Sequence, residues 1–127
     1  MSVSAFDARR TGVRRPLLAH APAEPFGPAR IAHWSSAANL DLLGTYLMVF
    51  DSTGVSDPWT LAYEESLYVI SGEAWIVELA GEDECTSTAS VGDLLVITRG
   101  ATVRYGGMEG TQLLLSIAPV NWDTEGA

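Results

Sequence analysis

The sequence contains no lysine, and basic residues are scarce beyond its first thirty positions. Residues 31–127 hold only two arginines against fourteen acidic residues, which gives this part of the chain a net charge of −12. Proteins that bind nucleic acid need clustered basic side chains to neutralise the phosphates. The sequence therefore argues against a nucleic acid as a partner.

Long apolar runs and cysteine pairs are also missing. No apolar stretch approaches the ~20 residues of a membrane-spanning helix, so we expect no membrane contact. The segment after the paired arginines lacks the apolar core of ~7–15 residues that an export signal needs. The single cysteine, Cys85, has no second thiol for a disulfide or a zinc site, and its acidic neighbours disfavour the reactive thiolate. Together these absences predict a cytoplasmic protein.

The sequence instead contains a series of short β-favouring runs separated by glycine-containing turns. The turns recur at hairpin spacing and no long helical period competes with them, which predicts an all-β fold with two antiparallel sheets around one core. Several runs are apolar at every position, which indicates that both faces are covered and favours a homodimer. The expected strands are residues 45–50, 66–70, 74–79, 94–97, 102–105 and 112–117.

Composition divides the chain into an arm and one domain. Residues 1–30 contain four prolines and no amphipathic period, so we expect an extended arm that frays or lies along a neighbouring subunit. Residues 31–127 form a stretch of the size of a single domain with one core.

Two glycine-bounded segments resemble the conserved motifs of the cupin superfamily. Glu65 and Gly72 match the carboxylate and glycine of G-x5-H-x-H-x3–4-E-x6-G, and Gly92-x7-Gly100 resembles the start of G-x5-P-x-G-x2-H-x3-N. The resemblance implies a double-stranded β-helix, or jelly-roll barrel, with an extended N-terminal arm. The metal-binding histidines of these motifs would fall on Trp59 and Leu61 (or Pro58 and Thr60) and on Val103.

A narrower resemblance covers residues 45–122. The segments 58–65, 68–72 and 118–122, which read PWTLAYEE, YVISG and APVNW, are similar to the cupin domain of the ethanolamine-utilisation family EutQ. That family's cupin also lacks the metal-binding histidines and has been described as an acetate kinase acting in ethanolamine catabolism. The resemblance implies the same fold and makes acetate kinase activity a candidate reaction.

Loss of the histidines bears directly on cofactors. The sequence has only His20 and His33, and neither lies at a cupin ligand position, so three imidazoles cannot meet within one subunit. An all-oxygen site built from Glu64 and Glu65 is the remaining route to a metal. We therefore expect no metal and no other cofactor.

Glu65 is the leading candidate for a catalytic residue. In a strand with period two it points into the barrel together with Leu67 and Val69, while Val103 and Tyr105 enter from the facing strand. Burial raises the pKa of a glutamate toward neutrality, where a general acid or base works best. The alternative is that Glu65 ties the strands together through hydrogen bonds to hydroxyl groups.

Further candidates surround Glu65 in the expected barrel. Tyr63 and Tyr105 are expected to polarise a carbonyl or hydroxyl group, and Glu64 would complete an acid/base dyad only if it shared a cavity with Glu65. Otherwise Glu64 points outward. The residues expected to contact a substrate are Trp59, Thr60, Leu67, Tyr68 and Val103.

Other polar residues are expected at the edges or on the surface of the barrel. His33, beside Trp34, either closes the mouth of the barrel as a proton shuttle or packs at a strand entry. Arg99 and Arg104 are expected in solvent or at an interface, and residues 121–122 are expected to fasten the chain end onto the sheet.

Three functions remain open. The first is an enzyme that uses Glu65 for acid/base chemistry on a small molecule, of the isomerase, cyclase, dehydratase or lyase type. The second is a binding or scaffold module of a metabolic assembly, without turnover. The third is acetate kinase activity, for which the sequence offers neither a phosphate-binding loop nor a lysine; only Mg²⁺ held by Asp51, Glu64 or Glu65 could compensate.

Overall fold

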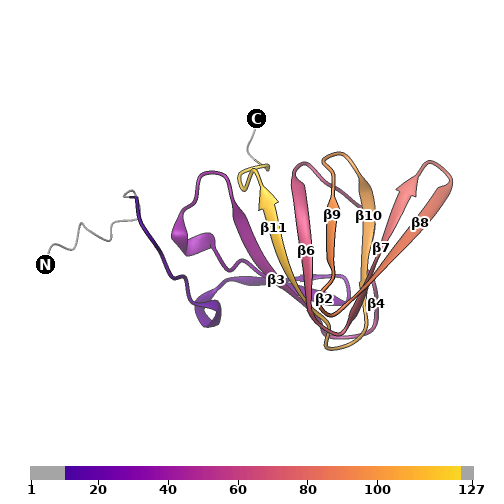
Figure 1. Cartoon of the computed structure of the whole chain (residues 1–127), viewed down its shortest axis with the longest axis horizontal. Coiled ribbons are helices and arrows are strands. Elements are labelled where there is room, and N and C mark those ends of the chain that lie inside the picture. Colours follow the sequence, from indigo (N-terminus) through magenta and orange to yellow (C-terminus); the bar gives the residue numbers. More distant parts are fainter. Residues whose placement is uncertain (1–10, 124–127) are drawn as a thin grey trace, which may run out of the picture.

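The computed structural model describes residues 11–123 of the chain, which contain eleven strands and two single-turn 3-10 helices (Figure 1). All strand pairs are antiparallel, as predicted. The larger sheet has six strands. In spatial order they are β1 (Ala23–Phe26), β2 (Ala29–Ala32), β3 (Gly44–Phe50), β11 (Gln112–Ala118), β6 (Glu64–Ser71) and β9 (Leu94–Ile97).

The second sheet faces the first and is built around one central strand, β10 (Thr102–Gly107). The short strands β4 (Gly54–Val55) and β5 (Trp59–Thr60) both pair with β10. On the other side of β10 follow β7 (Glu73–Ala80) and β8 (Asp83–Ser90). The helices η2 (Leu18–His20) and η3 (Ser36–Ala38) precede β1 and β3.

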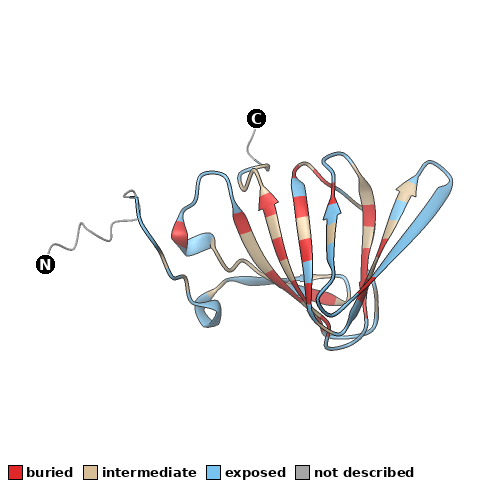
Figure 2. Cartoon of the chain, viewed as in Figure 1, coloured by how far each residue is buried: buried red, intermediate tan, exposed pale blue. Residues whose placement is uncertain are grey.

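The core lies between the two sheets and follows the period-two pattern of the strands. On β6 the residues Glu65, Leu67 and Val69 are buried, and on β11 the same holds for Leu113, Leu115 and Ile117. Tyr105 enters from β10. Figure 2 shows these buried positions as alternating bands along neighbouring strands. The predicted inward direction of Glu65 is confirmed.

Gly72 allows the chain to pass from one sheet to the other between β6 and β7. It has a φ of +79°, a left-handed conformation that favours glycine, and a Cβ at this position would lie 2.7 Å from the Thr111 Cα. Thr111 is itself buried, and its hydroxyl donates to the Glu73 carbonyl oxygen at 3.0 Å. The motif glycine is therefore required by a close approach of backbone, independently of any chemistry.

Two parts of the fold differ from the predictions. Residues 23–30, expected within the arm, form β1 and the start of β2, which pairs with β3 and so extends the larger sheet. The strand β8 was not predicted, because its residues are polar and only Ala89 is buried, so it lacks an apolar period. Among residues 11–123 no helix has the length and apolar character needed to cross a membrane.

Candidate functional site

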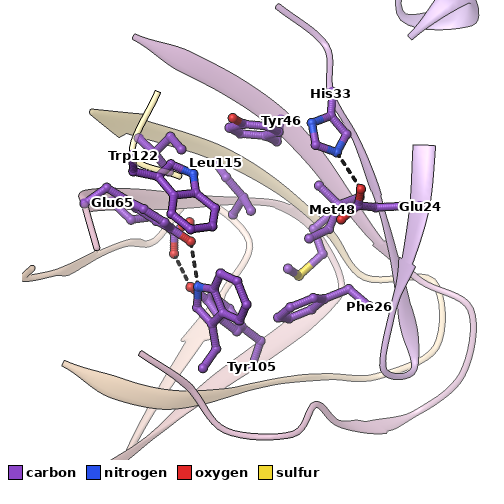
Figure 3. Close-up of a pocket in the computed structure, with 13 residues that line it drawn as sticks. Glu24, Phe26, His33, Tyr46, Met48, Glu65, Tyr105, Leu115 and Trp122 are labelled. Atoms are coloured by element: carbon purple, nitrogen blue, oxygen red, sulfur yellow. Dashed lines mark hydrogen bonds and ion pairs between the residues drawn. The ribbon is translucent and has the colours of Figure 1, made fainter. Parts of the chain in front are cut away.

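A pocket of about 140 Å³ opens between the two sheets on the side where β6 begins (Figure 3). Its walls come from segments far apart in the sequence: β1 and β2, β3, the stretch from β5 to β6, β10, β11 and the turn after β11. Of the residues that the sequence places in a site, Trp59, Tyr63, Glu65 and Tyr105 line it. The larger sheet supplies the carboxylate, and the facing sheet supplies Tyr105.

Glu65 is the buried carboxylate of this pocket, with 5% of its surface exposed. The Tyr105 hydroxyl donates a hydrogen bond of 2.7 Å to its Oε1. Its cross-strand neighbours on β11 and β9 are Ile117 and Ile97, which offer no polar group. Burial raises the pKa of Glu65 from the ordinary 4.5 to about 7, although the hydrogen bond from Tyr105 opposes part of that rise. The side chain is thus poised to gain or lose a proton near neutral pH.

Two tyrosine hydroxyls accompany Glu65 and stay protonated. Burial, followed by the nearby charge of Glu65, raises the pKa of Tyr63 to about 12 and raises that of Tyr105 as well. The indole Nε1 of Trp59 donates to the Tyr63 hydroxyl at 2.8 Å. Ser56 holds the strand that carries Tyr105, because its hydroxyl accepts the Tyr105 backbone N–H at 3.0 Å. Both hydroxyls therefore stay neutral, and Tyr105 is the one that donates to the carboxylate.

Aromatic rings form much of the remaining wall. Phe26 meets Trp59 and Tyr105 edge to face, at ring-centroid distances of 5.9 and 5.6 Å. Trp122, in the turn after β11, packs against Trp59 at 5.7 Å and Tyr63 at 5.3 Å. All but the tilted Tyr63–Trp122 pair, at 50°, are nearly perpendicular, which is a favourable geometry for aromatic rings. Trp122 thus packs inward onto the pocket.

A second polar pair lies across the pocket from Glu65, as Figure 3 shows. His33 Nε2 is 3.2 Å from Glu24 Oε2, and the His33 ring meets the ring of Tyr46 edge to face at 5.1 Å. The sequence predicts His33 either at the mouth of the barrel or packed at a strand entry, and it does not predict a role for Glu24. The only local signal was the Gly27-Pro28 pair, which marks a turn. The residues on either side form a hairpin in which Gly27 has a φ of +60°, although most of them do not favour strands.

Five predicted site residues lie outside this pocket. Glu64 is exposed on the opposite side of β6, so it neither shares a cavity with Glu65 nor forms a dyad or an oxygen site with it. Thr60 is exposed and hydrogen-bonded to the Thr102 hydroxyl at 2.7 Å. The other three are Tyr68, which is exposed, Leu67, which is buried in the core, and Val103, which lines a separate cavity. Strand alternation accounts for Glu64 and Tyr68, since both point away from Glu65.

The remaining polar candidates do not line the pocket. Arg104 donates to the Ser56 carbonyl oxygen at 3.1 Å, and Cys85 is exposed on β8. The residues that line the pocket include no arginine.

The three-histidine metal centre of cupins does not fit these residues. Neither possible alignment of the first motif, on Trp59 and Leu61 or on Pro58 and Thr60, places a histidine there, and Val103 stands at the position of the third. No group of three or more metal-ligating side chains exists within residues 11–123. His33 is the only imidazole that lines the pocket. We therefore assign no step to a metal at this site.

The sequence of the chain matches a known protein family. A family model described as ethanolamine utilisation protein EutQ matches residues 35–124. The chain belongs to the EutQ family. The protein named acetate kinase EutQ in Salmonella typhimurium is 33% identical over 67 residues, which are 53% of this chain and 28% of that protein. The chain thus spans less than a third of this EutQ relative. Glu24, Phe26 and His33 precede the residues that the family model matches.

Solved structures confirm the fold as that of a cupin. The EutQ protein of Clostridium difficile superposes with a TM-score of 0.61 and 23% identity over 74% of this chain and 71% of that one. KdgF from Halomonas superposes with a TM-score of 0.67 and 15% identity over 87% of this chain and 99% of that one. At these identities the likeness to the EutQ structure and to KdgF concerns the fold alone.

Proposed function

We propose that this EutQ-family cupin is an enzyme that uses Glu65 for acid/base chemistry on a small organic molecule. The observation that carries the proposal is the position of Glu65, a buried carboxylate that lines a pocket and whose pKa is raised by burial to about 7. A group with such a pKa is populated in both protonation states near neutral pH, as a general acid or base requires.

The neighbouring hydroxyls fit roles in the same reaction. Ionised Glu65 accepts a proton from carbon or oxygen of the substrate, while the hydrogen bond from Tyr105 steadies its carboxylate. Tyr63 accepts from the Trp59 indole, which leaves its own O–H available to donate toward a carbonyl or alkoxide oxygen. Because the raised pKa values keep both tyrosines protonated, they serve as donors. This arrangement suits isomerisation, cyclisation, dehydration or lyase chemistry.

Proton exchange with solvent tests the proposal without a known substrate. The protein is incubated in D₂O with a panel of small carbonyl compounds, alcohols and amines, including ethanolamine because the family description names its utilisation. Nuclear magnetic resonance then follows the loss of C–H signals. We expect exchange or conversion of at least one compound, lost in Glu65→Gln and kept in Glu64→Gln, whose side chain lies outside the pocket. A fully active Glu65→Gln protein would reject the proposal, and an inert wild-type protein would favour a binding or scaffold module.

A second candidate is acetate kinase activity, which the name of the Salmonella relative favours. The reaction transfers a phosphoryl group from ATP, and such transfers are stabilised by positive charge or Mg²⁺. The pocket lining contributes two carboxylates and no arginine, so the reaction would depend on Mg²⁺. Formation of ADP that requires both acetate and Mg²⁺, and that disappears in Glu65→Gln, would favour this candidate over acid/base chemistry.

We also propose that the protein works as a cytoplasmic homodimer. The support is the outer face of the six-stranded sheet, where Tyr68 and Ile70 on β6 and Leu94 and Val96 on β9 are exposed. A patch of this kind is typical of a protein interface. Light scattering coupled to size-exclusion chromatography measures the mass, and a monomer at micromolar concentration would overturn the proposal. Val96→Asp is expected to dissociate the dimer without altering the pocket.

A further inference from the structure

The pocket carries negative charge at two separate places and no arginine in its lining. Figure 3 shows Glu65 on one side of the pocket and Glu24 on the other. Glu24 has the His33 imidazole 3.2 Å away. Glu65 has the neutral hydroxyl of Tyr105 as its hydrogen-bond donor. When it ionises, its charge therefore lacks a basic partner within the pocket lining.

None of the five arginines within residues 11–123 lines the pocket, and three of them have partners elsewhere. Arg30 pairs with Asp51 at 2.8 Å on the surface, and Arg104 donates to the Ser56 carbonyl oxygen. Arg14 donates to the Ala38 carbonyl oxygen at 2.9 Å. With a net charge of −12 over residues 31–127, the surroundings also favour a cation over an anion in the pocket.

The walls between the two carboxylates are rich in aromatic rings. Trp59 packs nearly perpendicular to both Phe26 and Trp122, at 83° and 88°. Rings arranged in this way present both edges and faces to the space that they enclose. Aromatic faces attract cations through the negative charge above the ring, and desolvation strengthens this attraction.

We propose that the pocket binds a small organic cation, a primary ammonium ion, between the Glu65 carboxylate and the aromatic walls. The ammonium group offers three N–H donors, which match the Glu65 carboxylate and the nearby tyrosine oxygens. Trp59 and Trp122 face its alkyl carbons and positive charge, and Glu24 attracts it at the other side of the pocket. This inference rests on the site of the proposed function and names the substrate class of that site.

The inference makes binding depend on pH through Glu65. The titratable groups around Glu65 are Tyr105 on β10, Tyr63 before β6 and Tyr46 on β3, with Glu24 and His33 across the pocket. Its neighbours on β9 and β11 are isoleucines. A cation is held better by the ionised carboxylate, so affinity rises as the pH rises through about 7. Binding at neutral pH releases a proton from the fraction of molecules in which Glu65 is still protonated.

Calorimetric titration with three probes of similar size tests the inference. Ethylammonium chloride, 1-propanol and sodium propionate carry a positive charge, no charge and a negative charge, and sodium chloride keeps the ionic strength equal. We expect saturable binding of ethylammonium alone, with about tenfold higher affinity at pH 8 than at pH 6. Repeating the titration at pH 7 in buffers of different ionisation enthalpy should show release of about half a proton.

Matched variants separate the pocket from the general charge of the protein. Glu65→Gln mimics the protonated side chain, so it should nearly abolish ethylammonium binding at pH 8 and remove its pH dependence. Glu64→Gln makes the same change one residue away on the exposed side of β6 and should leave binding unchanged. If Glu65→Gln does not fold, the wild-type comparison of the three probes and the proton count still decide the question.

The outcomes distinguish this inference from the proposed enzymatic function. Tighter binding of propionate or 1-propanol than of ethylammonium would overturn the inference, as would equal losses in Glu64→Gln and Glu65→Gln. Ethylammonium binding in a protein that exchanges no protons in D₂O would support the inference and reject acid/base catalysis. Proton exchange on carbonyl compounds without ethylammonium binding would support acid/base catalysis and overturn this inference.

Discussion

The two faces of strand β6 give adjacent glutamates opposite environments. Glu65 points between the sheets, is buried and receives the Tyr105 hydrogen bond, whereas Glu64 points outward and is exposed. Their covalent chemistry is identical, and successive residues of a strand face opposite sides. Burial in a low-dielectric interior, rather than residue type, raises the pKa of Glu65 and makes it fit for proton transfer.

The same contrast extends along the strand to its apolar residues. Leu67 lies in the core between the sheets, and Ile70 lies on the outer face among other exposed aliphatic side chains. The inner face therefore serves both stability and chemistry, and the outer face is free to contact another molecule. Matched substitutions on the two faces test whether each face performs only its own role.

The largest expected effect comes from shortening aliphatic side chains on the two faces. Leu67 is 1% exposed and Ile70 is 40% exposed, and both lose three carbons on replacement by alanine. Leu67→Ala should lower the free energy of unfolding by about 2–5 kcal/mol because it leaves a cavity in the core. Ile70→Ala should cost about 1 kcal/mol or less. Urea denaturation of both variants at a concentration where the protein is monomeric measures the difference. Equal losses in the monomer would contradict the prediction, whereas an extra loss for Ile70→Ala in the dimer alone would show that the interface covers this residue.

The next effect concerns how stability depends on pH. The folded protein holds the Glu65 proton more tightly than the unfolded chain, because the pKa rises from 4.5 to about 7. The stabilisation that this proton provides is complete below pH 4.5 and is lost as the pH rises through about 7. Between pH 4 and pH 8 the wild-type protein should therefore lose about 3 kcal/mol relative to Glu65→Gln.

Denaturation of both proteins across this pH range supplies the measurement. Taking the difference between wild type and Glu65→Gln removes the contribution of the other carboxylates, which both proteins share. Two curves that run parallel would show that Glu65 is ionised at its ordinary pKa, and the acid/base proposal would lose its main support.

A smaller effect should follow from removing the partner of Glu65. Tyr105→Phe deletes the hydroxyl that donates to Oε1 and leaves the ring against Phe26. Because this hydrogen bond favours the ionised form, its loss should raise the pKa of Glu65 further. At pH 8 the variant should be less stable by about 2 kcal/mol. Carbon NMR of the labelled Glu65 carboxyl follows the titration directly, and a pKa that falls in Tyr105→Phe would contradict this account.

The sequence predicts the inner face of β6 better than it predicts the whole pocket. Alternation along a strand is a local property, so the burial of Glu65, Leu67 and Val69 could be foreseen from a short stretch of chain. Gly72 likewise marks a turn that only glycine tolerates at that φ. The fold class follows from such local signals repeated at hairpin spacing.

The far side of the pocket depends on contacts that no local pattern reveals. Glu24 and Phe26 reach the pocket because β1 pairs with β2, which in turn pairs with β3. Their proline-containing segment lacks an apolar period and therefore suggests an arm. Trp122 reaches the pocket only through the turn that follows β11. In the opposite direction, Thr60 and Tyr68 are close to Glu65 in sequence but point away from it.

Glu64→Gln has the smallest expected effect and serves as the matched control for Glu65→Gln. Its carboxylate is exposed, so its removal should change the free energy of unfolding by less than about 0.5 kcal/mol at any pH between 4 and 8. The same substitution one residue later is expected to change the pH dependence by about 3 kcal/mol. Denaturation curves that respond equally to both substitutions would show that net charge, and not burial on the inner face of β6, governs the titration. A flat response to Glu64→Gln alone would assign the shifted pKa to the pocket itself.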